Sequence, residues 1–562
     1  MKKNIQTAIT ASLIFIAAMV KAQSPGDWSY AVKAGGNNND AARGIVTDAA
    51  GNSFVTGNFD LTATFYGSVN INLTTNGAND IFLAKYDVTG NVVWAVKAGG
   101  KLTDGATGIC LDGSGNTYIT GSFMDTATFY GSSNIQLISN GGTDIFVAKY
   151  DNAGNVVWAT KAGGFGSENG SKIKADASGF TYVTGTFPND TCIFYGAIND
   201  SLFSNGQNDI FIASFDQNGV EIWATNAGGS GNDNGYGIEI DGAGNCFVAG
   251  AFLNKAYFYN ASGMDSLTSI GSNDIFVAMY DPNGDEVWVR QGGSTLTDQA
   301  QNVALDLAGN VYLTGNISTN CTFYAPNTNI VLTSNGSSDI FLASYTSTGD
   351  IRWAKHAGST LADFSSAINV NASNHCSITG MIGQGGATFY GTPNIVLTSN
   401  GSTDIFVVEY DTAGNALCGQ SGGSSGFDRG WDISSDGAGN SYVAGQFTAT
   451  ATFQSTPTIT LTATGGSNGD AFIGKWLSSC MATTGISSAV NNKISVFPNP
   501  VSNVMTLCTG QELGTIIICN YTGDIVLQAN SKNTREQIDI SKLPSGIYIV
   551  KTDKGNFKLL KQ

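Results

Sequence analysis

Short stretches in which apolar and polar residues alternate fill most of this chain and recur about every 65 residues. In the copy at 31–94, the segments GIVTD, SFVTGNF, DIFLAKYD and VVWAVKA are rich in β-branched and aromatic residues, as strands are. D-x-x-G-N joins the first two segments, where Asp favours a tight turn and Gly accepts a positive φ. The pattern predicts four antiparallel strands per copy and no helix.

A tryptophan recurs in the last strand of the copies and marks each of them. The series is Trp28, Trp94, Trp158, Trp223, Trp288 and Trp353, with Cys418 at the next equivalent position. A unit this small cannot bury its own apolar face and must stack on its neighbours. The last copy ends at DAFIGKW without a Trp strand, while the chain begins with an orphan one, DWSYAVKAGG. Pairing these two would remove the open edges of the array. The sequence therefore predicts an all-β fold over residues 23–480, a seven-bladed β-propeller with four-stranded blades whose N-terminal strand closes the last blade.

The copies also resemble a known family. AGG followed by D, then I-x-x-D-x-x-G-N-x-Y-V-T-G and D-I-F-V-A-K-Y, is similar to the SBBP or beta-propeller repeat of bacterial exported proteins. The resemblance covers about residues 24–480 and implies a propeller. It implies no particular activity.

Charge and composition narrow the function classes. Only 12% of the residues are charged and 72 are glycine, which favours turns over charged helices, and the net charge is −17. Phosphate backbones repel a fold this acidic, so a nucleic-acid partner is disfavoured.

Residues 1–22 have the features of a secretory signal peptide. Lys2 and Lys3 give the positive start, and the apolar run at 9–20 is too short to span a bilayer. Val20-Lys21-Ala22 precedes the expected cleavage site. No later segment approaches the roughly 20 apolar residues of a membrane helix. We therefore expect an exported mature protein without a transmembrane segment.

Export permits disulfides, but most of the nine cysteines do not form a framework. Those that share a position of the repeat lie in different blades, too far apart to bridge. The cysteines expected to pack as small apolar thiols are Cys110, Cys192, Cys246, Cys321, Cys376 and Cys418. Cys508 and Cys519 are candidates for a cross-strand pair.

Two acidic positions persist in every copy, beginning with Asp40 and Asp80. The first runs Asp40, Asp104, Glu168, Asp233, Asp298, Asp363 and Asp428, and the second Asp80, Asp144, Asp209, Asp274, Asp339, Asp404 and Asp470. Both are expected in loops on one face of the propeller. They either fix those loops by accepting backbone N–H bonds or form carboxylate pairs that bind Ca²⁺.

Positions that differ between copies are better candidates for a ligand site. In the presumed innermost strand, alternation turns one variable position toward the central channel. It reads Val46, Cys110, Lys174, Glu239, Ala304, Asn369 and Ser434. Lys174 and Glu239 fall in adjacent blades and are expected to pair. Two hypotheses remain, a polar channel for a small ligand, with Asn369 among its contacts, and a solvated funnel without one.

A recurring T-F-Y-G insertion displays tyrosines such as Tyr66, Tyr130 and Tyr195. Aromatic rings of this kind can stack on sugar faces or contact a protein. The alternative is that each tyrosine anchors the insertion onto its blade.

Catalytic motifs are scarce. The two histidines, His356 and His375, have no nucleophile motif beside them and no metal-ligand spacing. AGGxxxxD precedes a strand and lacks the Lys of a phosphate loop. We expect no catalytic residues and no cofactor apart from the calcium alternative.

The repeat ends near residue 480. MATTGISSAVNN at 481–492 is typical of a linker, and the short alternating strands of 493–562 are typical of a small Ig-like β-sandwich. Four motifs there resemble the type A C-terminal sorting domain of the type IX secretion system: Phe497-Pro498-Asn499-Pro500, Asn520-Tyr521-Thr522-Gly523, Leu543-Pro544-Ser545-Gly546-Ile547-Tyr548 and Lys558-Leu559-Leu560-Lys561. The resemblance implies that the type IX machinery is a partner and carries the protein across the outer membrane of a Bacteroidota-type bacterium. It also implies removal of the domain near the linker, often with attachment to surface lipopolysaccharide.

Together these features predict a secreted or cell-surface propeller that binds or adheres to glycans or proteins without catalysis. Two alternatives remain open. One is an extracellular carbohydrate-active enzyme, a hydrolase or lyase, that uses a propeller face. The other is a purely structural surface component.

Overall fold

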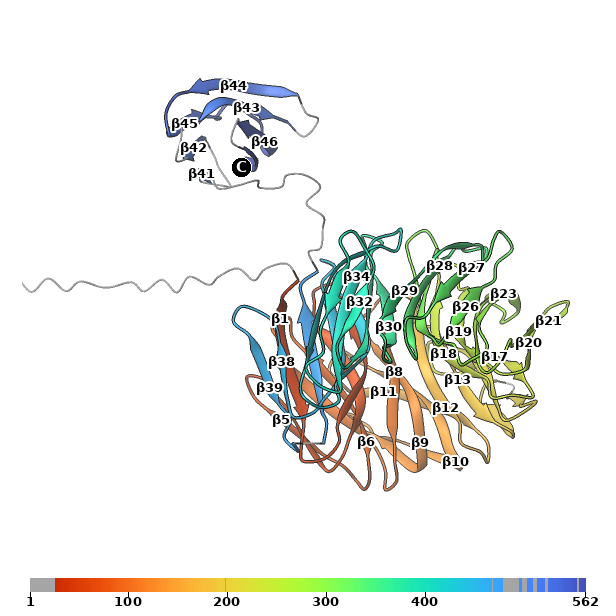
Figure 1. The fold of residues 1–562 in the computed structure, drawn as a ribbon. Coiled ribbons are helices and arrows are strands. Elements are labelled where there is room, and N and C mark those ends of the chain that lie inside the picture. The colour runs from red at the N-terminus through yellow and green to blue at the C-terminus, as the bar shows by residue number, and fades with distance from the viewer. Residues whose placement is uncertain are drawn as a thin grey trace, which may run out of the picture. The chain divides into compact units, whose positions relative to one another are not determined.

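The computed structural model describes residues 26–197, 199–466, 468–478, 495–497, 503–508, 513–520, 524–552 and 555–561. The predicted signal peptide and the predicted linker lie outside these residues. The described part contains strands and turns and no helix that is long and apolar enough to cross a membrane (Figure 1). The chain divides into two compact units, Met1–Cys480 and Met481–Gln562.

The first unit is built from groups of four antiparallel strands, in which β-branched and aromatic side chains alternate inward. The innermost strands are β2 (Ala41–Thr47), β8 (Gly105–Leu111), β12 (Asn169–Ala175), β18 (Asn234–Ile240), β24 (Gln299–Leu305), β30 (Phe364–Val370) and β36 (Arg429–Ser435). The second strands are β3 (Ser53–Phe59), β9 (Thr117–Phe129), β13 (Thr181–Pro188), β19 (Cys246–Phe252), β25 (Val311–Ile317), β31 (Cys376–Gly383) and β37 (Ser441–Phe447). The third strands are β6 (Asp80–Tyr86), β10 (Ile135–Tyr150), β16 (Asn208–Phe215), β22 (Asp274–Tyr280), β28 (Asp339–Tyr345), β34 (Thr403–Tyr410) and β40 (Asp470–Trp476). The outermost strands are β7 (Val92–Gly99), β11 (Val156–Gly163), β17 (Glu221–Gly229), β23 (Glu286–Gly293), β29 (Ile351–Gly358), β35 (Ala416–Gly423) and β1 (Trp28–Gly35).

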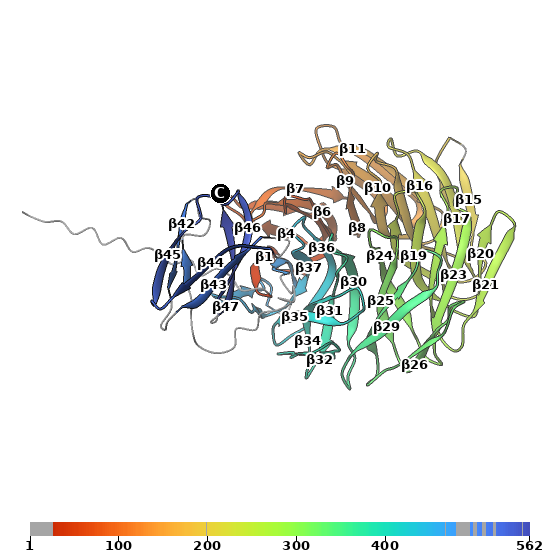
Figure 2. The same cartoon turned by 90° about the horizontal axis from the view of Figure 1, so that it is seen from above.

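These groups are the blades of a propeller. The innermost strands contact one another in the order β2, β8, β12, β18, β24, β30 and β36, and β36 contacts β2 again. In Figure 2, β8, β24, β30 and β36 lie toward the middle of this unit. The N-terminal strand β1 pairs with β40 and supplies the outermost strand of the last blade, as the sequence predicts. The all-β propeller is therefore confirmed.

Each T-F-Y-G insertion forms a hairpin that joins the preceding blade, not its own. The hairpin β4 (Thr62–Phe65) and β5 (Ile71–Thr74) of the first repeat pairs with β1 of the last blade. The equivalent hairpins are the ends of β9 and β10, β14 (Thr191–Phe194) with β15 (Asp200–Phe203), β20 (Lys255–Asn260) with β21 (Gly263–Thr268), β26 (Asn320–Phe323) with β27 (Ile330–Thr333), β32 (Ala387–Phe389) with β33 (Ile395–Leu397), and β38 (Thr450–Phe453) with β39 (Ile459–Thr462). The expectation that the insertion is anchored onto its own blade is wrong, because the edge of the preceding blade is the one left open beside it.

The first tryptophan does not belong to the repeating series. Trp94 lies opposite Lys85, and in the closing blade the residue opposite the matching Lys475 is Tyr30. Trp28 lies two residues earlier, opposite Trp476, in a fully buried position. The remaining tryptophans of the series donate their indole N–H to a turn of the next blade, in the pairs Trp94–Asn152, Trp158–Gln217, Trp223–Pro282, Trp288–Ser347 and Trp353–Thr412. The recurring tryptophan therefore joins neighbouring blades in addition to packing within one.

Two predictions about cysteines are wrong. Cys418, expected to be a thiol at a tryptophan position, is disulfide-bonded. Cys519 is a free, buried thiol in one sheet of the second unit, while Cys508 lies in the other sheet, so these two do not pair. The free and buried cysteines of the propeller are Cys110, Cys192, Cys246, Cys321 and Cys376.

The second unit consists of two sheets that share one apolar core. One sheet has the order β41 (Ser495–Phe497), β42 (Val504–Cys508) and β45 (Arg535–Asp539). The other has the order β44 (Ile525–Ser531), β43 (Gly514–Cys519), β46 (Gly546–Thr552) and β47 (Gly555–Lys561). Tyr548 is buried in this core and donates its hydroxyl to the carbonyl of Pro544 at 2.8 Å. Gly546 begins β46, Lys558 and Lys561 lie on β47, and Pro498, Asn499 and Pro500 lie outside the described residues.

Candidate functional site

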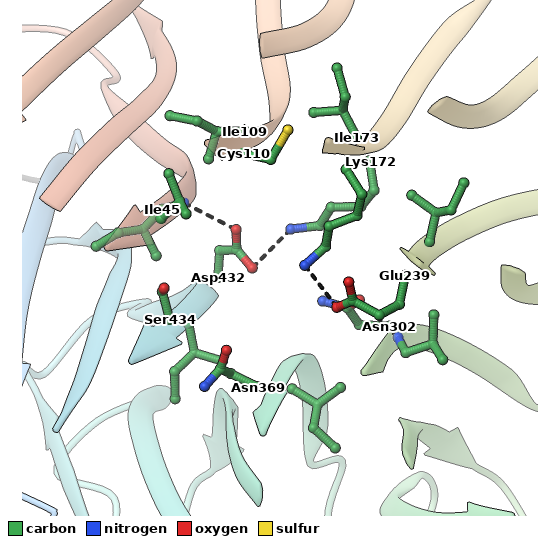
Figure 3. A pocket seen from close by; sticks show the side chains of 16 residues that line it. Ile45, Ile109, Cys110, Lys172, Ile173, Glu239, Asn302, Asn369, Asp432 and Ser434 are labelled. Atoms are coloured by element: carbon green, nitrogen blue, oxygen red, sulfur yellow. Dashed lines mark hydrogen bonds and ion pairs between the residues drawn. The ribbon is translucent and has the colours of Figure 1, made fainter. Parts of the chain in front are cut away.

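The innermost strands enclose a narrow central channel of about 70 Å³ (Figure 3). Lys174, Glu239 and Asn369, the residues expected there from alternation, are among its lining side chains. Each directly follows a buried isoleucine of its strand, and alternation then leaves the polar side chain for the axis. The lining is therefore mixed, with polar groups from some blades and apolar ones from others.

Two ion pairs cross this channel. Lys174 Nζ lies 2.8 Å from Glu239 Oε2, between adjacent blades. Lys172 Nζ lies 2.8 Å from Asp432 Oδ1, and this pair joins blades that are not neighbours. Burial alone would lower the pKa of Lys174, but Glu239 outweighs it and the pKa is raised, so the ammonium stays charged. The Lys172–Asp432 pair therefore obstructs the channel between its two ends (Figure 3).

At one end of the channel, every innermost strand carries an irregularity at the same position. The pairing register with the second strand shifts by one residue there, for example between Ala42 and Gly44. The residue left over projects toward the axis, and these residues are Arg43, Thr107, Ser171, Tyr236, Gln301, Ser366 and Trp431. They line a hollow of about 270 Å³ that we call the channel mouth, together with Asn169, Gly170, Lys172 and Arg429. β-Bulges re-aim side chains in this way and are common beside binding sites.

The sequence interpretation missed the channel mouth. Strict alternation places Arg43 and its equivalents on the opposite side of the strand from Val46, and only the bulge turns them toward the axis. A signal was present in the sequence. This position differs in almost every copy, while the residue before it is Ala or Gly in every copy except the one with Ser365.

Trp431 is the centre of the channel mouth. The guanidinium carbon of Arg43 lies 4.0 Å and that of Arg429 3.8 Å from the ring centroid. Two guanidiniums this close to one centroid would collide on a single face, so they cover opposite faces of the indole. Burial lowers the pKa of both arginines, and the charge of Arg43 adds to the effect on Arg429, whose pKa falls to about 10. Both therefore remain cationic at neutral pH.

The insertion tyrosines lie away from the channel and contact the preceding repeat. Tyr130 accepts a hydrogen bond from Asn76 at 3.0 Å, and Lys97 lies 5.3 Å from its ring centroid. Tyr195 makes the same contacts with the preceding repeat, and Lys33 lies 5.4 Å from the ring of Tyr66. These contacts hold each insertion on the preceding blade, which disfavours a row of free sugar-stacking rings.

The two acidic positions meet in pairs across blade boundaries. Asp40 lies beside Asp470 of the last blade, and Asp80 beside Asp104 of the next one, so Asp40 and Asp80 themselves do not pair. The remaining pairs are Asp144–Glu168, Asp209–Asp233, Asp274–Asp298, Asp339–Asp363 and Asp404–Asp428. All fourteen side chains are essentially buried.

Backbone amides hold these carboxylates in place. Asp233 accepts bonds from the N–H of Gly229 and of Leu253, and Asp209 accepts one from Asn205. This geometry fits the loop-fixing hypothesis. Within the described ranges, no group of three or more His, Cys, Asp or Glu side chains is placed to hold a metal ion. Calcium binding by Asp40 and Asp80 stays a prediction that their separation does not support.

The carboxyl pairs predict that the propeller is less stable above neutral pH. Burial raises the pKa of Asp209 and Asp233 from 3.8 to about 6 and that of Asp104 to about 7. Stability from a carboxyl with a raised pKa is complete below pH 3.8 and is lost as the pH rises through 6 to 7. The turn residue Asp216 behaves oppositely, because its hydrogen bonds outweigh burial and lower its pKa. We expect the Tm to be highest near pH 5 and at least about 3 °C lower at pH 8, measured by calorimetry.

A paired substitution isolates this effect. Asp209 Oδ1 has no hydrogen-bond partner among the described residues, so in Asp209→Asn an amide can donate toward Asp233. This variant is expected to raise the Tm at pH 8 and to flatten the pH profile. Asp216→Asn, the control, keeps the two backbone bonds to Oδ1 and loses only the bond that Asn218 Nδ2 donates to Oδ2, so it is expected to leave the pH profile of the Tm unchanged. A Tm that rises between pH 5 and pH 8 would contradict the prediction.

Two segments of the chain match known families. Residues 287–320 match the beta-propeller repeat, and residues 495–562 match the secretion system C-terminal sorting domain. A WD repeat-containing protein of Acanthamoeba polyphaga mimivirus is 24% identical over 440 residues, which are 67% of this chain and 32% of that protein. The chain thus spans about a third of the length of this relative.

Solved structures of low similarity include a WD40 domain and a bacterial surface protein. The Neurospora crassa Pan2 WD40 domain is 10% identical, with 66% of this chain and 88% of that chain covered and a TM-score of 0.26. PorZ of Porphyromonas gingivalis, described as an essential surface component of the type-IX secretion system, is 12% identical, with 95% and 100% covered and a TM-score of 0.17. On its two family matches, this chain carries the beta-propeller repeat and ends in a secretion system C-terminal sorting domain, which indicates secretion through the type IX system.

Proposed function

We propose that this protein is a secreted or cell-surface binding protein that holds a glycan or protein group at the channel mouth without transforming it. The observation that carries the proposal is the ring of seven bulge residues, in which side chains of different chemistry converge on one hollow of about 270 Å³. This volume is near the lower end of the range of about 300–1,000 Å³ for small-molecule pockets. The ligand is therefore a single small group or the end of a larger molecule.

The chemistry around the channel supports binding over catalysis. Glu239 and Asp432, the carboxylates of the channel, are each tied to a lysine at 2.8 Å and are poor general bases. Burial raises the pKa of the Cys110 thiol, which leaves it a weak nucleophile. His375 pairs with Glu409, and His356 packs against Tyr390, both outside the channel lining. Among the residues described around the mouth and channel, none forms an activated nucleophile with a base.

A screen of the full-length secreted protein tests the proposal. We expect it to retain one class of glycan or protein on an array, and to leave the same compounds intact in hydrolase and lyase assays. Turnover of any of them would replace the proposal with the carbohydrate-active alternative. Absence of both binding and turnover would favour a purely structural surface role.

A further inference from the structure

The channel mouth is cationic although the protein is strongly acidic. Arg43, Lys172 and Arg429 line it, and none of the other lining residues is Asp or Glu. The chain as a whole has a net charge of −17. Lys172 is paired with Asp432, which leaves Arg43 and Arg429 as two uncompensated cations, and these raise the local concentration of negative ligands.

The two arginines have no carboxylate partner among the residues that the structure describes. Arg429 donates its Nε–H to Ser366 Oγ at 3.0 Å, and both guanidiniums otherwise rest on Trp431. The ion pairs of the described residues include Lys172 with Asp432 and leave out Arg43 and Arg429. Charges that are partly removed from water are normally paired. A planar guanidinium offers two parallel N–H donors, which match the two oxygens of a carboxylate.

The indole N–H of Trp431 gives an independent indication of a ligand. Nε1 is buried and has no hydrogen-bond partner within the described part of the chain. Buried donors are nearly always satisfied, and an exception at a binding hollow indicates an acceptor that is supplied from outside. Trp431 is also the residue on which both arginines stack, so the missing acceptor and the unpaired cations meet at one place.

The rest of the lining is neutral and rich in hydrogen-bonding groups. It consists of the hydroxyls of Thr107, Ser171, Tyr236 and Ser366 and the amides of Asn169 and Gln301. Such groups both donate and accept, as the hydroxyls of a sugar ring require. The remaining lining residue, Gly170, adds little bulk to the hollow.

We propose that the channel mouth binds a uronic acid residue at the end of an acidic glycan. Arg43 and Arg429 receive the carboxylate side, and the hydroxyl and amide groups receive the ring hydroxyls. This inference rests on the proposed binding function and names its ligand class. The ion pair of Lys172 and Asp432 closes the floor of the site, so the glycan chain extends outward and does not thread the channel.

Calorimetric titration of the full-length protein tests the inference. The probes are galacturonate, glucuronate and a trigalacturonide, with galactose and glucose as neutral counterparts. We expect the uronates to bind, the neutral sugars to bind at least about tenfold more weakly, and uronate affinity to fall as salt is raised. Arg43→Gln and Arg429→Gln should each weaken uronate binding about 10- to 100-fold, the range for loss of a charged hydrogen bond.

Arg290→Gln is the matched control, because Arg290 also stacks on a tryptophan, Trp288, but lies on the outermost strand β23. It should bind uronates like the unaltered protein, and the Tm of every variant shows whether it is folded. Equal binding of uronate and neutral sugar, or arginine variants that are folded and bind normally, would overturn the inference but leave the binding function standing. Binding of a peptide carboxylate in place of uronates would overturn the glycan assignment. No binding to any sugar or peptide would overturn the inference and the proposed function together.

Discussion

Removal of residues 495–562 is expected to stop secretion, so that the truncated protein accumulates in the periplasm. These residues match the secretion system C-terminal sorting domain, and they form a unit with its own apolar core. The blades of the propeller draw their cores from residues before 480. Truncation should therefore leave a folded propeller that lacks only its export signal. Fractionation and immunoblotting would place the protein, and a thermal melt of the periplasmic material would show that it is folded.

A full-length variant with a change in the propeller controls for altered expression. Lys255→Gln suits this purpose, because Lys255 is exposed on the hairpin strand β20. It should be secreted like the unaltered protein. Tyr548→Ala, which removes a buried side chain of the sorting domain, should reduce export without touching the propeller. Normal secretion of the truncated chain would refute the role assigned to residues 495–562.

Trp28→Ala is expected to destabilise the propeller by about 3–5 kcal/mol, the cost of truncating a buried aromatic side chain. Trp28 is fully buried at the closure, where its ring lies edge-on to Phe453 with 5.2 Å between centroids. The strand that carries it holds the last blade together through β40. Loss of this packing should weaken the closure and also the contact with the preceding blade, because the hairpin strand of Phe453 pairs with β35 of that blade. Denaturant unfolding of the full-length protein measures the change.

Trp223→Ala is the matched control, since Trp223 occupies the repeating position and is only partly buried. It should cost less, chiefly the bond to the carbonyl of Pro282 and part of the packing. Gly474→Ala tests the closure from the other side, because its Cβ would lie 2.6 Å from the Trp28 ring. We expect about 1–3 kcal/mol from this overpacking. Equal effects of Trp28→Ala and Trp223→Ala would mean that the closure is not a distinct packing site.

The closure of the propeller by β1 shows what the spacing of residues along the sequence predicts and what it does not. The sequence predicts correctly that the first strand completes the last blade. The chain begins with an outermost strand that has no blade of its own, and the last copy lacks its outermost strand. The sequence assigns the wrong tryptophan to the series, because Trp28 and Tyr30 are both aromatic and differ by only two positions in a variable spacing. In a regular strand, residues two apart share a face, so alternation along the sequence cannot detect the error. A bulge between Trp28 and Tyr30 instead places them on opposite faces, in the cores on either side of the last blade. Only the pairing of Tyr30 with Lys475 reveals it.

The candidate site was harder to predict for a related reason. Lys174 and Glu239 follow from alternation along a regular strand, and they do lie in the channel. Arg43 and Trp431 depend on an extra residue in the strand, which apolar–polar alternation does not reveal and which only the variability of this position indicates. Their contact also joins the first blade to the last. No spacing within one repeat indicates that they meet.

Because the hairpin of each repeat pairs with the preceding blade, one sequence repeat does not coincide with one structural blade. Each copy contains a T-F-Y-G hairpin, which pairs with the preceding blade. It also contains an outermost strand, which pairs with the hairpin of the next copy. Unequal crossing-over that inserts or deletes one whole copy would therefore leave every outermost strand with a hairpin to pair with. The pairing of β1 with β40 at the closure would also be kept. Gene duplication or deletion can therefore change the number of copies in single steps, because no new contact between blades has to evolve first.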